Sequence, residues 1–128
     1  MKYLLDTHVF LWWISDDARL SPRLRGRIAA PNVELLWSVA SSWEVGIKYA
    51  LGKLPLAEPP GPLLARHRYL NRVGVLPIME AHALAAAALP ALHHDPFDRL
   101  LVGQAMLEGV ELLTADPAVL AYFVAAGE

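Results

Sequence analysis

Short apolar segments alternate with longer helix-forming segments along almost the whole chain, and this alternation is the strongest constraint on its fold. Four of the apolar segments have the length of strands. They are residues 2–5, 33–38, 75–78 and 110–114. Strands that alternate with helices pair in parallel, because each helix carries the chain back across one face of the sheet. The pattern predicts an α/β fold with a central parallel sheet and helices on both faces, a three-layer α/β/α sandwich.

Helix boundaries are marked by capping residues. Ser21 followed by Pro22 is a typical helix start, and Gly52 and Gly109 suit the left-handed position that ends a helix. These signals predict helices over residues 7–16, 22–30, 41–52, 63–72, 80–89 and 96–108, and a short one starting near residue 117. The segment YFVAAG, residues 122–127, is expected to add a short edge strand.

Length and composition narrow the class of protein. The chain has 128 residues, of which 55% are hydrophobic, so we expect a single folded domain over residues 1–128. Its apolar runs are too short or too weakly hydrophobic to span a bilayer, and its start lacks the features of a signal peptide. We therefore expect a soluble protein of the cytoplasm. The absence of cysteine excludes disulfides, thiolate zinc sites and cysteine nucleophiles.

The net charge of −2 argues against binding to nucleic acid by bulk electrostatics alone. Basic residues are nevertheless clustered in two stretches, residues 19–27 and 66–72. Two interpretations stay open for them. They are either solvated helix faces or the rim of a site that holds a polyanion.

Four acidic residues stand where a predicted strand is followed by a helix. They are Asp6, Glu44, Asp98 and Asp116. Ligands of parallel α/β sheets bind beyond the carboxyl ends of the strands, so we expect these carboxylates to converge in one site. Because clustered carboxylates repel one another, their pKa values are expected to be raised, and a hard cation such as Mg²⁺ or Mn²⁺ is the natural ligand. The pattern indicates metal-dependent phosphate chemistry.

Each acid also has a purely structural interpretation. Ser41 and Glu44 form a capping box, Asp95 and Asp98 occupy the corresponding places before the helix at Pro96, and Asp116 precedes Pro117. Asp6 has no comparable structural role, because Thr7 beside it would cap a helix equally well. Lys48 follows Glu44 by four residues and is expected to pair with it, with contact to a phosphate as the alternative.

Other chemistries have weaker signals. His93, His94 and Asp95 suggest zinc, but adjacent side chains on a turn point apart and no further histidine is suitably spaced. The sequence has no G-x-S-x-G motif of serine hydrolases and no glycine-rich nucleotide-binding loop.

Four segments together resemble a known family. LLDTHVFLWW, SSWEVGIKYALGKL, HHDPFDRLLVGQA and LLTAD are similar, in order and spacing, to the PIN-domain ribonucleases, and most of all to the VapC-type toxins of bacterial toxin–antitoxin pairs. The resemblance covers essentially the whole chain. It implies the three-layer α/β/α fold, Mg²⁺- or Mn²⁺-dependent endoribonuclease activity, a homodimer and a VapB-like antitoxin that blocks the site. One departure is the C-terminus, which ends early for a full final strand.

The resemblance also implies roles for the acids. Asp6 and Asp98 are expected to bind the metal directly, whereas Glu44 and Asp116 act through water or at a second metal, with the Thr114 hydroxyl beside Asp116. Metal-activated water would then hydrolyse an RNA phosphodiester bond and leave 3′-hydroxyl and 5′-phosphate ends.

Two other functions remain as alternatives. A receiver-type signalling domain has the same size and fold class, but it needs a lysine near its last strand, and this chain has no lysine after Lys53. A catalytically silent PIN-like domain that only binds RNA or a protein is the second alternative, in which every acid is a helix cap.

Bulky apolar residues point to a partner. The segment VFLWWI, residues 9–14, and the helix face with Trp43, Ile47 and Leu51 carry more apolar surface than one small sheet layer hides. We expect a groove near the acids that accepts an amphipathic helix of an antitoxin, whose basic side chain pairs with the carboxylates. The alternative places all four tryptophans in the core.

Overall fold

The chain folds around a four-stranded sheet in which all pairings are parallel. A computed structural model describes residues 1–125. The strands lie in the order β3-β2-β1-β4, so the first strand is internal. Their bounds are β1 (Lys2–Leu5), β2 (Glu34–Ser38), β3 (Gly74–Leu76) and β4 (Glu111–Leu113). The predicted parallel sheet is confirmed, with β1 at its predicted bounds and the other three strands shorter than the sequence indicates.

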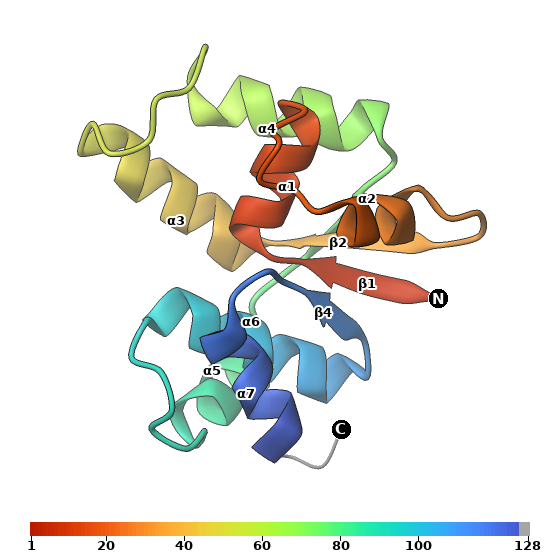
Figure 1. Ribbon diagram of the computed structural model, residues 1–128. Helices are drawn as coiled ribbons and strands as arrows, with labels where there is room; N and C mark the ends of the chain where they lie inside the picture. The colour runs from red at the N-terminus through yellow and green to blue at the C-terminus, as the bar shows by residue number, and fades with distance from the viewer. Residues whose placement is uncertain (126–128) are drawn as a thin grey trace.

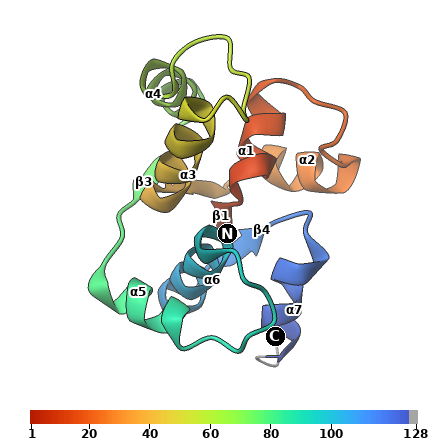
Figure 2. The same cartoon turned by 90° about the vertical axis from the view of Figure 1, so that its left-hand side faces the viewer.

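Seven helices cover the two faces of the sheet. They are α1 (Thr7–Ile14), α2 (Pro22–Ala29), α3 (Val39–Ala50), α4 (Pro60–Leu70), α5 (Glu80–Ala87), α6 (Pro96–Glu108) and α7 (Pro117–Ala125). Figures 1 and 2 show α1 to α4 on one face and α5 to α7 on the other. This arrangement is the predicted three-layer α/β/α sandwich. No described helix is both long enough and apolar enough to cross a membrane.

Alternate residues of the strands serve the two layers. Tyr3 and Leu5 of β1 belong to the core under α1 to α4, whereas Leu4 belongs to the core under α6 and α7. Because successive side chains of a strand point to opposite faces, a short apolar strand supplies both cores at once. Trp37 of β2 is fully buried and packs on Phe10, with ring centroids 4.6 Å apart.

The helix signals place most boundaries correctly. The Ser21 hydroxyl accepts a hydrogen bond from the Leu24 amide at the start of α2, and the Asp95 carboxylate accepts from the amides of Phe97 and Asp98 at the start of α6. Gly109 ends α6 with φ of 66°. Each cap satisfies backbone groups that the helix itself leaves without partners.

Three sequence-based expectations are wrong. The helix expected over residues 63–72 begins at Pro60 and ends at Leu70, because its prolines stand in the first turn, where proline is tolerated. The helix predicted from Ser41 begins at Val39 and is capped by Ser38, whose hydroxyl accepts from the Ala40 amide, so Ser41 lies within the helix. The expected edge strand is also absent among the described residues, because Tyr122 to Ala125 continue α7, and residues 126 and 127 lie outside them.

Candidate active site

A cavity of about 380 Å³ opens beside the carboxyl ends of β1 and β4, and all four acids singled out from the sequence line it. Asp6, Glu44, Asp98 and Asp116 come from four different parts of the chain, yet the parallel sheet brings them to one edge. The expected convergence in one cavity is therefore observed. The roles of the four acids in binding a metal or in catalysis remain predictions.

Asp6 is fixed at the junction of β1 and α1. One carboxylate oxygen accepts from the His8 amide at 2.9 Å, and the other accepts from the Thr114 hydroxyl at 2.7 Å. The side chain is almost fully buried. Burial raises the pKa of Asp6, although the hydrogen bonds from Thr114 and His8 oppose this effect. The expectation that Asp6 has no capping role is wrong, because Asp6 is the N-cap of α1, so capping and a place in the cavity are compatible.

Glu44 is not a helix cap. It lies in the second turn of α3 and is only 2% exposed, whereas the Ser41 hydroxyl accepts from the Thr7 hydroxyl at 2.7 Å. The predicted capping box is wrong because the helix starts two residues before Ser41. One carboxylate oxygen of Glu44, Oε2, pairs with Lys48 Nζ at 2.6 Å, as the spacing of four residues predicts.

The second carboxylate oxygen of Glu44 has no partner. Oε1 is buried and makes no hydrogen bond within the part of the chain that the structure describes. Unpartnered buried oxygens are rare, and an unsatisfied charged group costs more than a neutral one. Because Glu44 lines the cavity, a cation in the cavity would provide the missing partner.

Asp98 lies in the first turn of α6, below the cap that Asp95 provides. Burial raises the pKa of Asp98 to about 6, and the charges of Asp95, Asp6 and Glu44 contribute in the same direction. The expected rise in pKa is thus observed for Asp98 and Asp6. Its main cause is burial, however, and repulsion between the carboxylates is the smaller contribution.

Asp116 follows β4 and begins α7, where its Oδ1 accepts from the Ala118 amide at 2.9 Å. Its own amide donates to the Thr114 hydroxyl, which in turn donates to Asp6. Thr114 therefore connects two acids of the cavity through one hydroxyl.

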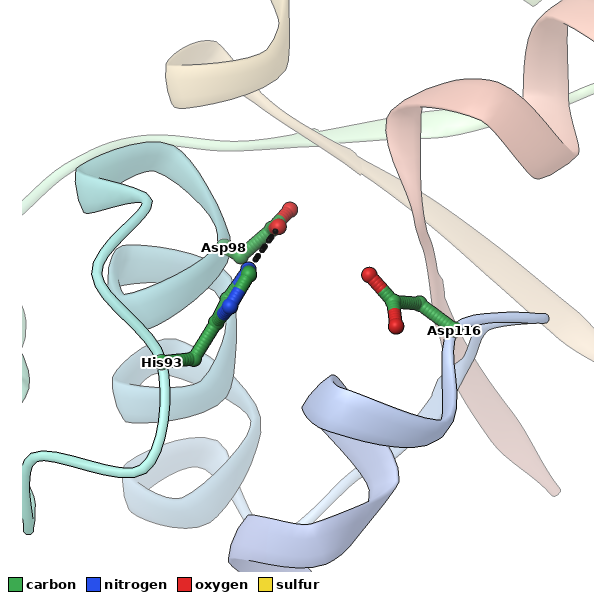
Figure 3. Close-up of side chains that lie close together, drawn as sticks. All are labelled: His93, Asp98 and Asp116. Atoms are coloured by element: carbon green, nitrogen blue, oxygen red, sulfur yellow. Dashed lines mark hydrogen bonds and ion pairs between the residues drawn. The ribbon is translucent and has the colours of Figure 1, made fainter.

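His93 belongs to the site and was not selected from the sequence. Its Nε2 lies 2.8 Å from Oδ2 of Asp98, and Figure 3 shows its ring beside the Asp98 carboxylate, opposite Asp116. His94 instead lines a separate hollow over α5 and α6. The adjacent pair does point apart, as expected. In the sequence, His93 was considered only as part of a weak zinc pattern with His94 and Asp95.

The donor set of the cavity fits a divalent cation. Carboxylate oxygens are the ligands that Mg²⁺ and Mn²⁺ prefer. Asp98, which is partly buried, has a raised pKa, and the buried Glu44 has an oxygen without a partner among the described residues. Lys48 offers one positive charge on the same lining. Although burial disfavours its charged form, the ion pair with Glu44 raises the pKa of Lys48, so it stays charged.

Arginines of the first basic stretch are engaged in ion pairs. Arg19 pairs with Asp17 and Arg25 pairs with Asp16, each at 2.8 Å. Arg27 pairs with Glu111. Only Arg19 lines the cavity, where its guanidinium lies over the Trp12 ring at 5.3 Å.

An apolar groove of about 570 Å³ adjoins the acidic cavity, and the two share His8, Trp12 and Arg19. Leu11 and Ile14 of α1 line it together with residues 53–57 and α4. Trp43 and Leu51 are about 60% exposed and do not line this groove. The expected apolar surface is thus divided between a groove at α1 and a face of α3, and the alternative that places every tryptophan in the core is wrong.

Known proteins resemble the chain in sequence and structure. The model of the PIN domain family matches residues 3–122. Ribonuclease VapC22 of Mycobacterium tuberculosis is 33% identical over 116 residues, which cover 88% of this chain and 85% of that protein.

Two solved structures share the fold. VapBC-1 from nontypeable Haemophilus influenzae superposes with a TM-score of 0.67 at 19% identity and covers 98% of this chain and 94% of the other. VapBC2 from Rickettsia felis, bound to a DNA fragment from its promoter, gives a TM-score of 0.64 at 18% identity, with coverages of 91% and 89%.

Proposed function

Since this chain belongs to the PIN domain family, we propose that it is a divalent-cation-dependent endoribonuclease and the toxin of a toxin–antitoxin pair. The ribonuclease relative supports the RNA substrate, and the cavity supports the chemistry. The observation that carries the proposal is Oε1 of Glu44, a buried carboxylate oxygen without a partner among residues 1–125, in a residue that lines a cavity with four further acids.

The cation would be held by side chains from four elements. Asp6 and Asp98 are proposed as direct ligands, and Glu44 and Asp116 as ligands through water or at a second cation. A bound Mg²⁺ or Mn²⁺ supplies positive charge against the scissile phosphate and lowers the pKa of water. Glu44 has a buried oxygen without a partner among the described residues, and Asp6 and Asp98 have raised pKa values. Together these properties favour cation binding over a silent domain in which every acid is a cap.

The chain itself positions the reacting groups. The Thr114 hydroxyl and the His8 amide hold the Asp6 carboxylate in one orientation, so its direction is set before any ligand arrives. Lys48 holds Oε2 of Glu44 in an ion pair and adds, on the lining of the cavity, a charge that can contact a phosphate oxygen. Hydrolysis by water leaves 3′-hydroxyl and 5′-phosphate ends.

A second part of the proposal concerns the antitoxin. The two structural neighbours are VapBC complexes, which supports a VapB-like partner. We place an amphipathic helix of this partner in the apolar groove, because the groove leads directly to the acids through His8, Trp12 and Arg19. A basic side chain beyond that helix would pair with the carboxylates. The exposed α3 face with Trp43, Ile47 and Leu51 is proposed as the homodimer contact.

Cleavage of labelled RNA tests the nuclease. Wild-type protein should cut RNA in Mg²⁺ or Mn²⁺ and lose this activity in EDTA. Asp6→Asn should lower the rate about 100-fold or more, since even the outer contacts of metal ligands account for 10–100-fold. Asp16→Asn makes the same chemical change at an exposed acid outside the cavity and should retain full activity. Cleavage by Asp6→Asn at the wild-type rate, or in EDTA, would refute the mechanism.

Co-purification tests the partner. Ala57 is exposed and lines the groove, so Ala57→Arg should block the antitoxin helix while RNA cleavage continues. A complex with the product of the adjacent small open reading frame that survives this substitution unchanged would contradict the placement.

A further inference from the structure

Three groups on one side of the cavity offer a donor set that differs from the oxygen-only ligands described so far. A nitrogen of His93 and carboxylate oxygens of Asp98 and Asp116 all lie within 4.8 Å of one another. Figure 3 shows the carboxylates of Asp98 and Asp116 facing a common space, with the His93 ring against Asp98. The three side chains come from the α5–α6 connection, α6 and the β4–α7 connection.

We propose that His93 is a direct metal ligand that, together with Asp98 and Asp116, forms a nitrogen-containing site for a divalent transition-metal ion. This inference rests on the proposed nuclease function and adds to it a ligand that selects among cations. Asp98 belongs both to this site and to the oxygen-only site with Asp6 and Glu44. Asp6, Glu44 and Asp98 line the same cavity.

The spacing of two donors, on His93 and Asp98, suits one ion, and a small movement of Asp116 would bring the third within reach. Adjacent ligand atoms of an octahedral ion with bonds of about 2.1 Å are about 3.0 Å apart. Nε2 of His93 and Oδ2 of Asp98 are 2.8 Å apart, which is close to that separation. Without a cation, a proton joins these two atoms. A cation bound by both takes the place of that proton, so the contact itself is no obstacle to ligation.

The backbone of His93 is held rigidly in place. The buried Tyr122 hydroxyl accepts from the His93 amide at 2.8 Å and donates to the His93 carbonyl at 3.0 Å. Arg99 donates to the same carbonyl and to the Tyr122 hydroxyl, and it also binds the carbonyls of Ala86, Leu89 and Pro90. These bonds fix the backbone of His93, and the contact of its Nε2 with Asp98 sets the direction of the ring, as a metal ligand requires.

A second observation points to a cation in the same cavity. Oε1 of Glu44 is unpartnered among the described residues, and the Glu44 side chain is 3% exposed. Glu44 lines the same cavity as Asp98 and Asp116, so a cation bound there would lie near a carboxylate that has an unpartnered oxygen among the described residues.

The ligand types determine the selectivity. Mg²⁺ prefers an all-oxygen shell and accepts imidazole poorly, whereas transition-metal ions accept both nitrogen and carboxylate ligands. With His93 as a ligand, the site should bind Mn²⁺ in preference to Mg²⁺. His94 is the matched control, because it is adjacent in sequence but lines a different hollow.

Pulsed electron paramagnetic resonance of bound Mn²⁺ tests the ligand directly. The protein with Mn²⁺ should show coupling to a nitrogen nucleus, and biosynthetic ¹⁵N labelling of histidine should change that coupling. His93→Gln should abolish it, whereas His94→Gln should retain it. His8→Gln should also retain it, which excludes the histidine that lies 3.9 Å from Asp6. The labelled wild-type protein gives the answer even if a variant fails to fold.

Binding titrations give the second measurement. His93→Gln should weaken Mn²⁺ binding at least about tenfold and change Mg²⁺ binding much less, so the preference for Mn²⁺ falls. If His93 only orients Asp98, both affinities fall by the same factor and no histidine nitrogen couples to Mn²⁺. That result would overturn the inference and leave the nuclease proposal intact, whereas absence of RNA cleavage by the Mn²⁺-loaded wild type would refute the nuclease and leave the ligand assignment standing.

Discussion

Replacement of Asp98 by asparagine should stabilise the metal-free protein at neutral pH. The pKa of Asp98 is raised from 3.8 to about 6, so the folded state holds this proton more tightly than the unfolded state. The stability that Asp98 contributes is full below pH about 4 and is lost as the pH rises through about 6. Relative to the protonated form, the ionised Asp98 costs roughly 2 kcal/mol at pH 5 and roughly 3 kcal/mol at pH 7.5.

Asparagine carries no such cost at either pH. The advantage of Asp98→Asn over wild type in EDTA should therefore grow by roughly 1 kcal/mol between pH 5 and pH 7.5, or roughly 4 °C in Tm for a domain of this size. Asp98 lines an open cavity, so screening by solvent lowers this value and makes it an upper limit. Thermal unfolding of both proteins at the two pH values measures the difference.

Asp17→Asn is the control for this experiment. Hydrogen bonds from Arg19 lower the pKa of Asp17 to about 2, so both folded and unfolded states are ionised there between pH 5 and pH 7.5. Its stability difference from wild type should not change over that range. Added Mn²⁺ should reverse the order for Asp98→Asn, because only wild type binds the cation fully. An advantage of Asp98→Asn that is the same at both pH values would refute the reasoning.

Two further substitutions test the packing of α6 against α5 and the orientation of the Asp6 carboxylate. Gly103→Ala should destabilise the protein by about 1–3 kcal/mol in urea unfolding, because its Cβ would lie 3.0 Å from the backbone of Ala86 in α5. Gly46→Ala, where a Cβ meets nothing within 4 Å, should cause no loss, and equal stability of the two variants would contradict the close contact. Thr114→Val removes the hydroxyl that donates to Asp6 and should weaken cation binding about tenfold in calorimetry. An unchanged affinity would show that Thr114 does not orient Asp6.

Much of the fold follows from local patterns in the sequence. Strand and helix alternate clearly. The helix starts at Ser21 and Asp95 are each predicted from a capping residue followed by proline. The start of α3 was misplaced because Ser38 and Ser41 are both suitable caps, and only the end of β2 decides between them. The last helix was misread in part because YFV has the composition of a strand, whereas Tyr122 is buried on α7 against the second core.

The acids of the site could be predicted because a parallel sheet fixes where its strand ends lie. Asp6 and Asp116 follow two strands that pair directly, so their proximity is a consequence of topology. His93 could not be identified in this way, because its place depends on Tyr122 and Arg99, which hold the connection before α6. The dominance of burial over repulsion in the pKa values likewise depends on packing that no motif displays.

The most direct test of the central claim is the rate of RNA cleavage by Glu44→Gln in saturating Mn²⁺, compared with Glu34→Gln. Both substitutions remove one carboxylate, but Glu44 is buried in the cavity and Glu34 is exposed at the start of β2. If the cavity holds the catalytic cation, Glu44→Gln should cleave about 100-fold more slowly or worse while it stays folded, and Glu34→Gln should match wild type. Equal cleavage by a folded Glu44→Gln protein would contradict the assignment of this cavity as the active site.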